Sequence, residues 1–303
     1  MFNLSVFRRV IALCFTVLLV NNASAELDKL DKTTLKKAMA AKKVNISALS
    51  LGGYCGSCLK LQVTNNTQRN MAINVDPGLI FLPADSSMQN LVAWGDEQVE
   101  IAPGATKDVT LETFCGKSYA HCPRADVKYT FWKQGDSGMV STLKFAKANG
   151  IAPTVVQSAV WMFTNGHSLN NVYNTYYRPE SEKLVNYIAQ LKHLPIPAFY
   201  TVYPLNNRPG ESVIKKDSGK VVVPVKWGHE DYKQMYVTIY KANGDVYRRV
   251  DADRVIDKNG VTVLVEFKPK NDLNGIYKVQ AKDNNNRIWY EKEVEIDFDE
   301  RHF

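Results

Sequence analysis

The sequence predicts a mainly β fold, with two β-sandwich domains and a helical insert, on three observations. Between residues 44 and 132, and again between 221 and 296, short runs alternate apolar and polar side chains. Turn residues separate these runs at intervals of about eight to twelve positions, as in sandwich domains. Between the two regions, residues 148–177 contain no Asp, Glu, Lys or Arg, and apolar side chains there recur with helical spacing.

The first 25 residues have the pattern of a signal peptide. Arg8 and Arg9 precede an apolar run from Val10 to Val20, and Ala23-Ser24-Ala25 supplies the small side chains of a cleavage site. We therefore expect cleavage near Ala25 and a protein that is secreted, periplasmic or held at the cell surface. An uncleaved anchor is the alternative, although the run is short for a membrane span. No later stretch predicts a transmembrane span.

Residues 26–43 are expected to form a short basic helical arm. Asp31 is placed to cap this helix, and Leu35, Ala38 and Met39 form a narrow apolar edge. Nothing in the sequence requires the arm to pack against the rest of the chain.

Residues 44–193 are assigned to the first sandwich domain, and its helical insert occupies residues 137–193. The β part alternates as strands do, and segments such as Asn65-Asn66-Thr67 and Asp76-Pro77-Gly78 have turn composition. Strands are expected over residues 45–49, 59–63, 71–75, 79–82, 91–94, 98–101, 109–114 and 127–132. Short strands at this spacing are typical of a β-sandwich or a small barrel.

The insert is expected to hold a pair of helices, preceded by a weaker helical edge over residues 137–149, that close one end of the sandwich. The first begins at Pro153, where a missing N–H costs nothing, and ends at Gly166. The second begins at Pro179 and stops before Pro195. The first is apolar nearly all round, so other elements must cover it. Its apolar side chains are Val155, Val156, Ala159, Val160, Met162 and Phe163.

Residues 194–210 contain four prolines and are predicted to be a linker. Residues 211–303 alternate again and are assigned to a second sandwich, with a hairpin turn at Asn243-Gly244. The segment from Asn274 to Val279 resembles the later strands of bacterial immunoglobulin-like modules. That resemblance implies an immunoglobulin-like domain that serves as a spacer or a binding unit.

Four cysteines follow the signal: Cys55, Cys58, Cys115 and Cys122. An even number in an exported chain predicts two disulfides, for which three pairings are open. Two alternatives use the same thiols. One is a zinc site of four thiolates with His121 nearby, which an oxidising compartment disfavours. The other is redox chemistry at Cys55 and Cys58, which lacks the helix that such a motif requires. We expect no metal and no cofactor.

Residues 157–164 (Gln-Ser-Ala-Val-Trp-Met-Phe-Thr) resemble the Gln-x-Ala-x-Trp segment of bacterial surface thioester domains. The resemblance implies an adhesin in which Gln157 joins a Cys thiol and the bond captures an amine on a host surface. Cys55 is the most plausible thiol. The chain departs from that family in the further cysteines near Cys55. The alternative is that Gln157 is a buried polar residue of the helix, which must then find hydrogen-bond partners.

A loop rich in Asn and Tyr follows the first helix of the insert. Asn170, Tyr173, Tyr176 and Tyr177 form a candidate ligand surface, because Tyr and Asn combine rigid area with adaptable hydrogen bonding. A protein or a glycan would be the partner. The alternative is that the tyrosine rings pack on the sandwich while their hydroxyls stay in water.

The remaining patterns narrow the function. The formal charge of +7 comes from scattered Lys and Arg without interleaved aromatics, so we expect no nucleic-acid partner. The five His residues show no metal spacing, and the chain has no nucleophile elbow or phosphate loop. The sequence thus predicts an exported, non-enzymatic protein for binding, adhesion or contact with the cell envelope. The alternatives are a thioester adhesin and an extracytoplasmic enzyme with its site at the domain junction.

Overall fold

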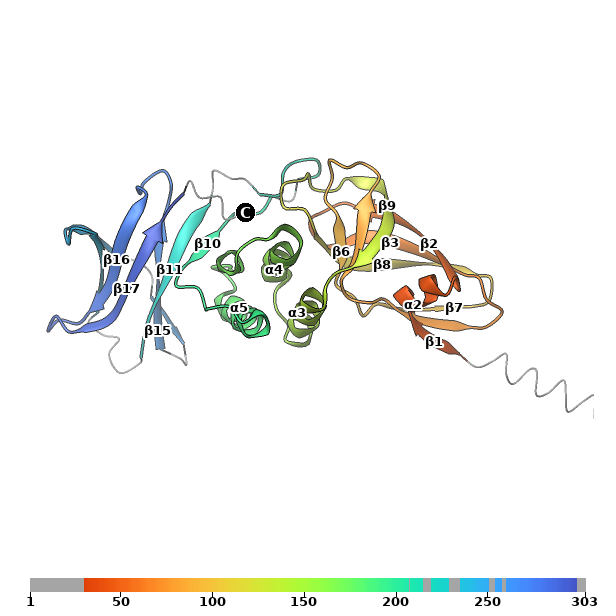
Figure 1. Ribbon diagram of the computed structural model, residues 1–303, viewed down its shortest axis with the longest axis horizontal. Coiled ribbons are helices and arrows are strands. Elements are labelled where there is room, and N and C mark those ends of the chain that lie inside the picture. Colours follow the sequence, from red (N-terminus) through yellow and green to blue (C-terminus); the bar gives the residue numbers. More distant parts are fainter. Residues whose placement is uncertain are drawn as a thin grey trace, which may run out of the picture.

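The structure is a computed structural model. In the described residues the chain is mainly β, with helices inserted between two groups of strands, as the sequence predicts. The helices lie between a barrel and a pair of sheets (Figure 1). The structure describes residues 30–206, 208–214, 219–228, 235–250, 254–257 and 260–298. The predicted signal peptide lies outside these ranges.

The first β part is a closed barrel of antiparallel strands. In order around the barrel, the strands are β2 (Val44–Leu51), β3 (Cys55–Asn65), β8 (Thr106–Cys115), β6 (Leu91–Ala93), β5 (Leu79–Pro83) and β9 (Ala125–Gln134). The barrel closes because β9 pairs with β2 on one side and with β5 on the other. The register shifts in both pairings, and such bulges bend strands as closure requires.

The alternation over residues 44–132 predicts a sandwich or a small barrel, and the chain forms the barrel instead of the sandwich assigned to the first domain. Every expected strand is present, so the local patterns are confirmed. Sandwiches and small barrels share the same alternation of side chains, and only the double pairing of β9 separates them.

A three-stranded sheet shares the barrel's core. Its strands are β1 (Asp31–Thr34), β4 (Met71–Asn74) and β7 (Gln98–Ile101), with β1 parallel to β4 and β4 antiparallel to β7. Met71, Ile73 and Ile101 are almost fully buried in the same cluster as the barrel interior.

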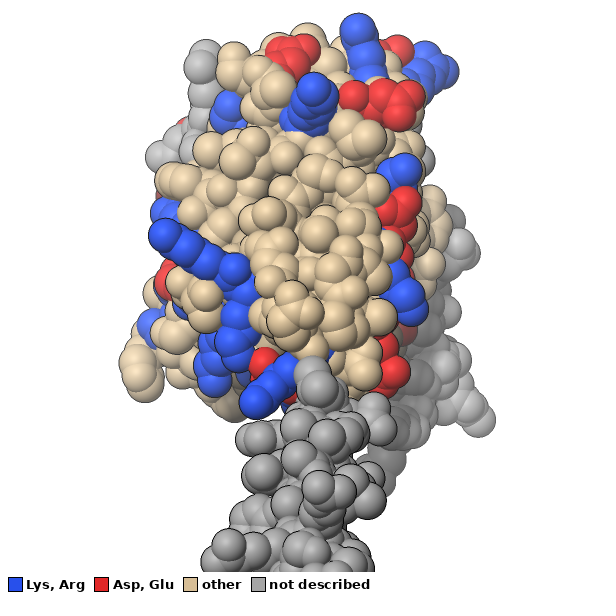
Figure 2. All heavy atoms as spheres, turned by 90° about the vertical axis from the view of Figure 1, so that its right-hand side faces the viewer, with Lys and Arg blue, Asp and Glu red and all other residues tan. Residues whose placement is uncertain are grey.

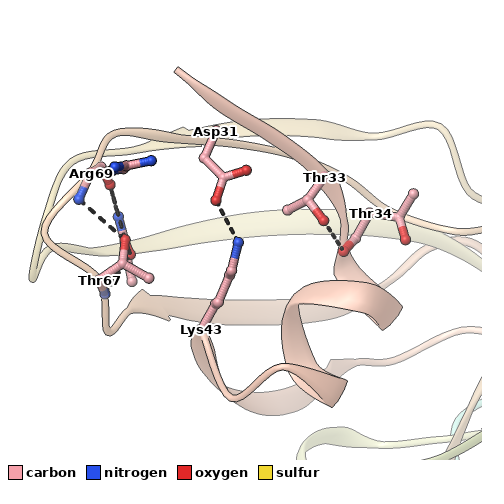
Figure 3. Close-up of polar contacts among 7 residues, drawn as sticks. Asp31, Thr33, Thr34, Lys43, Thr67 and Arg69 are labelled. Carbon is pink, nitrogen blue, oxygen red and sulfur yellow. Dashed lines mark hydrogen bonds and ion pairs between the residues drawn. The ribbon is translucent and has the colours of Figure 1, made fainter. Parts of the chain in front are cut away.

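The arm expected over residues 26–43 is helical only in α2 (Leu35–Ala40). Asp31 does not cap this helix but lies in β1, and Lys43 Nζ binds its carboxylate at 2.7 Å (Figure 3). Thr34 is the cap and accepts a hydrogen bond from the Lys37 N–H. The arm is packed because Leu35 is fully buried in the barrel core.

The two faces of the barrel strands contact different parts of the protein, because successive side chains of a strand point to opposite sides. Leu79 and Phe81 of β5 face the barrel interior. Ile80 between them packs with the helices, as does Phe114 of β8. The wall of the barrel is therefore buried on both sides where the helices cover it.

The insert contains α3 (Ser137–Ala148), α4 (Pro153–Asn165), the short 3-10 turn η1 (Leu169–Asn171) and α5 (Arg178–Lys192). The limits predicted for α4 are confirmed: Pro153 is its first residue, and Gly166 ends it in the left-handed conformation, with φ of 70°. Val156 and Val160 are buried as expected, and Phe163 is half-buried.

The helices join the two β parts instead of closing one end of a sandwich (Figure 1). Their hydrophobic cluster includes Val92 and Phe114 of the barrel together with Tyr200 and Val222 from beyond the insert. One apolar cluster thus links the outer face of the barrel, the insert and the first sheet of the second β part.

The second β part consists of two four-stranded sheets. One sheet has the order β10 (Tyr200–Val202), β11 (Lys220–Trp227), β15 (Gly260–Phe267) and β14 (Arg254–Asp257). The other has the order β13 (Val246–Val250), β12 (Tyr236–Lys241), β16 (Gly275–Lys282) and β17 (Ile288–Ile296). Val223 of the first sheet and Val279 of the second are fully buried in one shared cluster.

The predicted linker, residues 194–210, is partly structured. Its residues 200–202 form β10 and pair with β11. The chain then returns to the barrel, where the N–H of Cys122 donates to the carbonyl of Glu211 at 2.8 Å. Val213, which the sequence assigns to the second domain, is fully buried in the barrel core.

The barrel end of the molecule, opposite the second β part, has a broad uncharged area, with Lys and Arg along one side and charges of both signs along the other (Figure 2). Within the described part of the chain, no helix is both long enough and apolar enough to cross a membrane.

Candidate functional site

A cleft of about 480 Å³ lies where the barrel, the insert, the segment predicted as a linker (residues 194–210) and the second β part meet. This volume falls within the usual range for small-molecule sites. The residues that line it are Tyr54, Thr154, Asn174, Thr175, Tyr176, Val202, Tyr203, Pro204, Leu205 and Lys220.

Local structure explains how distant segments reach this cleft. Tyr54 immediately precedes β3, and Thr154 lies in the first turn of α4. The loop that carries Tyr176 is held by its own side chains, since Asn174 Oδ1 accepts from the Tyr176 N–H at 2.9 Å. The Asn174 N–H in turn donates to Ser181 Oγ of α5 at 3.0 Å.

Within the described part of the chain, Lys220 is the one charged residue that lines the cleft. Its ammonium group binds the carboxylate of Glu266 on the neighbouring strand β15. Burial by itself would raise the pKa of Glu266, but Lys220 and Lys268 lower it below its usual value. The cleft therefore presents tyrosine rings and neutral hydrogen-bonding groups, with its cation already paired.

A second, smaller cavity of about 30 Å³ lies beside the cleft. Five residues line both spaces: Thr154, Asn174, Val202, Tyr203 and Leu205. The residues that line only this inner cavity are Ser158, Trp161, His167, Asn171, Tyr173 and Ile214.

Several residues of the inner cavity carry buried polar atoms that have no hydrogen-bond partner among the described residues. These atoms are Thr154 Oγ1, Trp161 Nε1, Asn171 Oδ1, Asn171 Nδ2 and Tyr173 Oη. A buried group without a partner costs about 1–3 kcal/mol. Folded proteins satisfy such groups with ordered water or with a ligand, so this cluster indicates a site that receives one or the other.

His167 lies at the edge of the inner cavity and is neutral at physiological pH. Burial lowers its pKa from 6.5 to about 4. Its Nε2 atom is 2.9 Å from Ser118 Oγ, and the Ser118 N–H donates to Asn165 Oδ1 at 2.9 Å. Ser118 is fully buried and does not line the cavity. The two contacts of Ser118, with His167 and Asn165, therefore hold the loop after β8 against the end of α4.

The four residues of the predicted ligand surface have different environments. Tyr176 is 91% exposed and lines the cleft. Tyr173 is buried, lines the inner cavity and stacks on Tyr200 with ring centres 4.0 Å apart. Tyr177 precedes α5, and Asn170 is half-buried. Neither of these two lines the cleft or the inner cavity.

Other residues of the site were not predicted. Tyr54, Tyr203 and Thr154 come from three separate segments. Trp161 lies on the predicted buried helix, within the segment that resembles thioester domains, and neither feature indicates a cavity. The alternation and helical spacing around them carry no sign of a cavity, so no sequence signal distinguishes them from ordinary core and surface residues.

The four cysteines gather at the end of the barrel behind Tyr54. Cys58, Cys115 and Cys122 belong to the barrel core, and Cys55 is half-buried. Burial, and then the neighbouring thiols Cys122, Cys58 and Cys55, raise the pKa of Cys115. All four are free thiols in the structure, so the two disulfides stay a prediction. Among the described residues, no group of three or more His, Cys, Asp or Glu is arranged to hold a metal.

Gln157 is fully buried on α4, and both polar atoms of its side chain bind the main chain of Cys115. Its Oε1 atom accepts from the Cys115 N–H, and its Nε2 atom donates to the Cys115 carbonyl, each at 2.8 Å. This pairing satisfies the amide without a covalent bond. The thioester between Gln157 and Cys55 stays a prediction.

Comparison of the chain with protein-family models, with curated proteins and with solved structures finds no match. Inferences about its function therefore rest on its own residues and their geometry.

Proposed function

We propose that this chain is an exported binding protein that holds a polar ligand in the cleft between its barrel, its insert and its second β part. The observation that carries the proposal is the inner cavity. There, Thr154, Trp161, Asn171 and Tyr173 each have a buried polar atom without a partner among the described residues. A cleft of ligand size lies directly beside it.

The lining also supports binding in preference to catalysis. Among the residues that the structure describes, no Asp or Glu lines the cleft or the inner cavity, and general acid–base catalysis most often relies on such groups or on His. His167 is neutral and already bonded to Ser118. An enzyme with its site at this junction is therefore the weaker alternative.

Export and an immunoglobulin-like scaffold belong to the same proposal. The signal pattern of residues 1–25 would deliver the chain across a membrane, with cleavage near Ala25. The two face-packed sheets of the second β part have the layered architecture of immunoglobulin-like sandwiches. Immunoglobulin-like domains often act as rigid supports, and here such a domain would form one wall of the cleft.

A thioester adhesin is the second proposal. The Gln157 side chain lies against the main chain of Cys115, which belongs to the group of four thiols. A covalent bond from Gln157 would require that pairing to break. Intact-mass measurement distinguishes the two proposals, because a thioester lowers the mass by one ammonia.

The binding proposal is tested by thermal unfolding of the full chain in the presence of neutral sugars, short peptides and nucleosides. At least one class should raise the melting temperature. Tyr176→Ala should abolish that shift, because it removes an exposed ring from the cleft. Tyr236→Ala is the matched control, since Tyr236 is 55% exposed and lies on β12 away from the cleft. A shift that survives Tyr176→Ala, or no shift with any class, contradicts the proposal.

A further inference from the structure

The size of the inner cavity limits what can enter it. About 30 Å³ is enough for one or two polar non-hydrogen atoms but not for a ring. The adjacent cleft, at about 480 Å³, holds several rings. A ligand that uses both spaces therefore has a bulky body and a small polar group that projects from it.

The unpartnered atoms define the chemistry of that small group. The indole N–H of Trp161 only donates, while Asn171 offers an amide that both donates and accepts. The hydroxyls of Thr154 and Tyr173 can take either role. A hydroxyl or hydroxymethyl group also donates and accepts, so it matches this mixture.

A charged group does not match the cavity. The described residues that line it include no Asp, Glu, Lys or Arg. His167 is neutral above about pH 4. Burial of an unpaired ion costs far more than burial of a hydroxyl, which excludes a carboxylate, a phosphate or an ammonium group from the inner cavity.

The cleft favours a ligand whose larger part is flat, apolar on its faces and polar at its edges. Tyr54, Tyr176 and Tyr203 offer ring faces, and Asn174 and Thr175 offer edge contacts. A sugar ring has this character, because its C–H groups pack on aromatic faces while its hydroxyls point outward to hydrogen-bonding partners. Lys220 adds little attraction for an anion, since Glu266 already binds it.

We propose that the ligand of this site is a neutral saccharide that packs a sugar ring against the tyrosines of the cleft and places one hydroxyl or hydroxymethyl group in the inner cavity. This inference rests on the proposed binding function and names the class of ligand. The unpartnered atoms have almost no accessible surface, so their side chains must turn toward the inner cavity before a ligand hydroxyl can bond to them.

The test is isothermal titration of the full chain with maltotetraose, cellotetraose, mannotetraose and the tetramer of N-acetylglucosamine. A galacturonate tetramer and an Ala-Ser tetrapeptide serve as the charged and peptide probes. We expect at least one neutral sugar to bind more tightly than both of these. Tyr173→Phe, which removes only the buried hydroxyl, should weaken that sugar about tenfold, the equivalent of one hydrogen bond.

Tyr187→Phe is the matched control, because Tyr187 is also a stacked tyrosine of the insert but lines neither space. It should bind the sugar like the unaltered chain. Equal loss in both variants, or full affinity in Tyr173→Phe, overturns the assignment of the inner cavity. Tighter binding of the galacturonate overturns the choice of a neutral sugar.

Failure of this inference is distinguishable from failure of the proposed function. Binding of the peptide but of no sugar, with loss in Tyr176→Ala, overturns the saccharide class and leaves the cleft as a binding site. Binding of no probe, together with a crystal structure in which ordered waters satisfy Asn171 and Tyr173, overturns both.

Discussion

The side-chain amide of Gln157 pairs with the main chain of Cys115 through two hydrogen bonds, each 2.8 Å long. The pairing joins α4 to the last residue of β8 and so attaches the insert to the barrel. The next turn of the same helix carries Trp161, which lines the inner cavity. The position of the cavity wall therefore depends on this contact.

Gln157→Leu should destabilise the protein by about 2–4 kcal/mol, because it leaves a buried carbonyl of Cys115 without its partner. The Cys115 N–H would keep only its 3.1 Å bond to the Tyr54 carbonyl. Denaturant unfolding measures the change. Gln98→Leu on the exposed side of β7 is the control and should stay within about 0.5 kcal/mol of the unaltered protein. Equal stability of the two variants would contradict a structural role for the amide.

The same pairing predicts that Gln157 keeps its primary amide. Intact-mass measurement of the mature protein after reduction should show no loss of ammonia, and methylamine should leave the mass unchanged. A thioester would lower the mass by one ammonia, and methylamine would then add to it. A deficit that disappears in Cys55→Ser would establish the adhesin interpretation instead.

The burial of His167 predicts that stability falls as the pH drops from about 6.5 to about 4. Its pKa is 6.5 in the unfolded chain and about 4 in the folded protein, so over this interval only the unfolded chain binds the proton. The loss amounts to at most about 3 kcal/mol, and the contribution is fully present above pH 6.5.

Unfolding free energies measured across this interval for the unaltered protein and for His167→Gln check the prediction. Glutamine keeps a polar partner for Ser118 but does not titrate, so the difference between the two curves isolates His167. Parallel curves would show that the imidazole is accessible to protons in the folded state.

Peptide mapping without reductant should find disulfides that join Cys55 and Cys58 to Cys115 and Cys122. Three residues of an extended strand separate two Cα atoms by roughly 10 Å, and a disulfide requires less than about 7 Å. Cys55 and Cys58 both lie in β3, where Gly56 has a φ of 89° and the register shifts between Ser57 and Leu59. A bond between the two cysteines would need this end of the strand to rearrange further. A Cys55–Cys58 peptide in the map would show that this end of β3 is not extended in the oxidised protein.

The sequence by itself determined the elements with local causes. Pro153 and Gly166 mark the ends of α4 because one lacks an N–H and the other accepts positive φ. The burial of Val156 and Val160 followed from helical spacing, and the strands of both β parts followed from alternation. The four cysteines and the exposed Tyr176 were also identified from residue type and context.

Only the tertiary structure decided how those elements pair and what lies between them. Closure of the barrel depends on β9 meeting both β2 and β5, and strand pairing between distant segments has no local signature. The same holds for β1 in the predicted arm and for β10 in the predicted linker. The cleft and the inner cavity combine Tyr54, Thr154 and Tyr203 from three segments. The pattern of apolar side chains shows which face of a helix or strand is buried. Only the packed chain determines which other element covers that face.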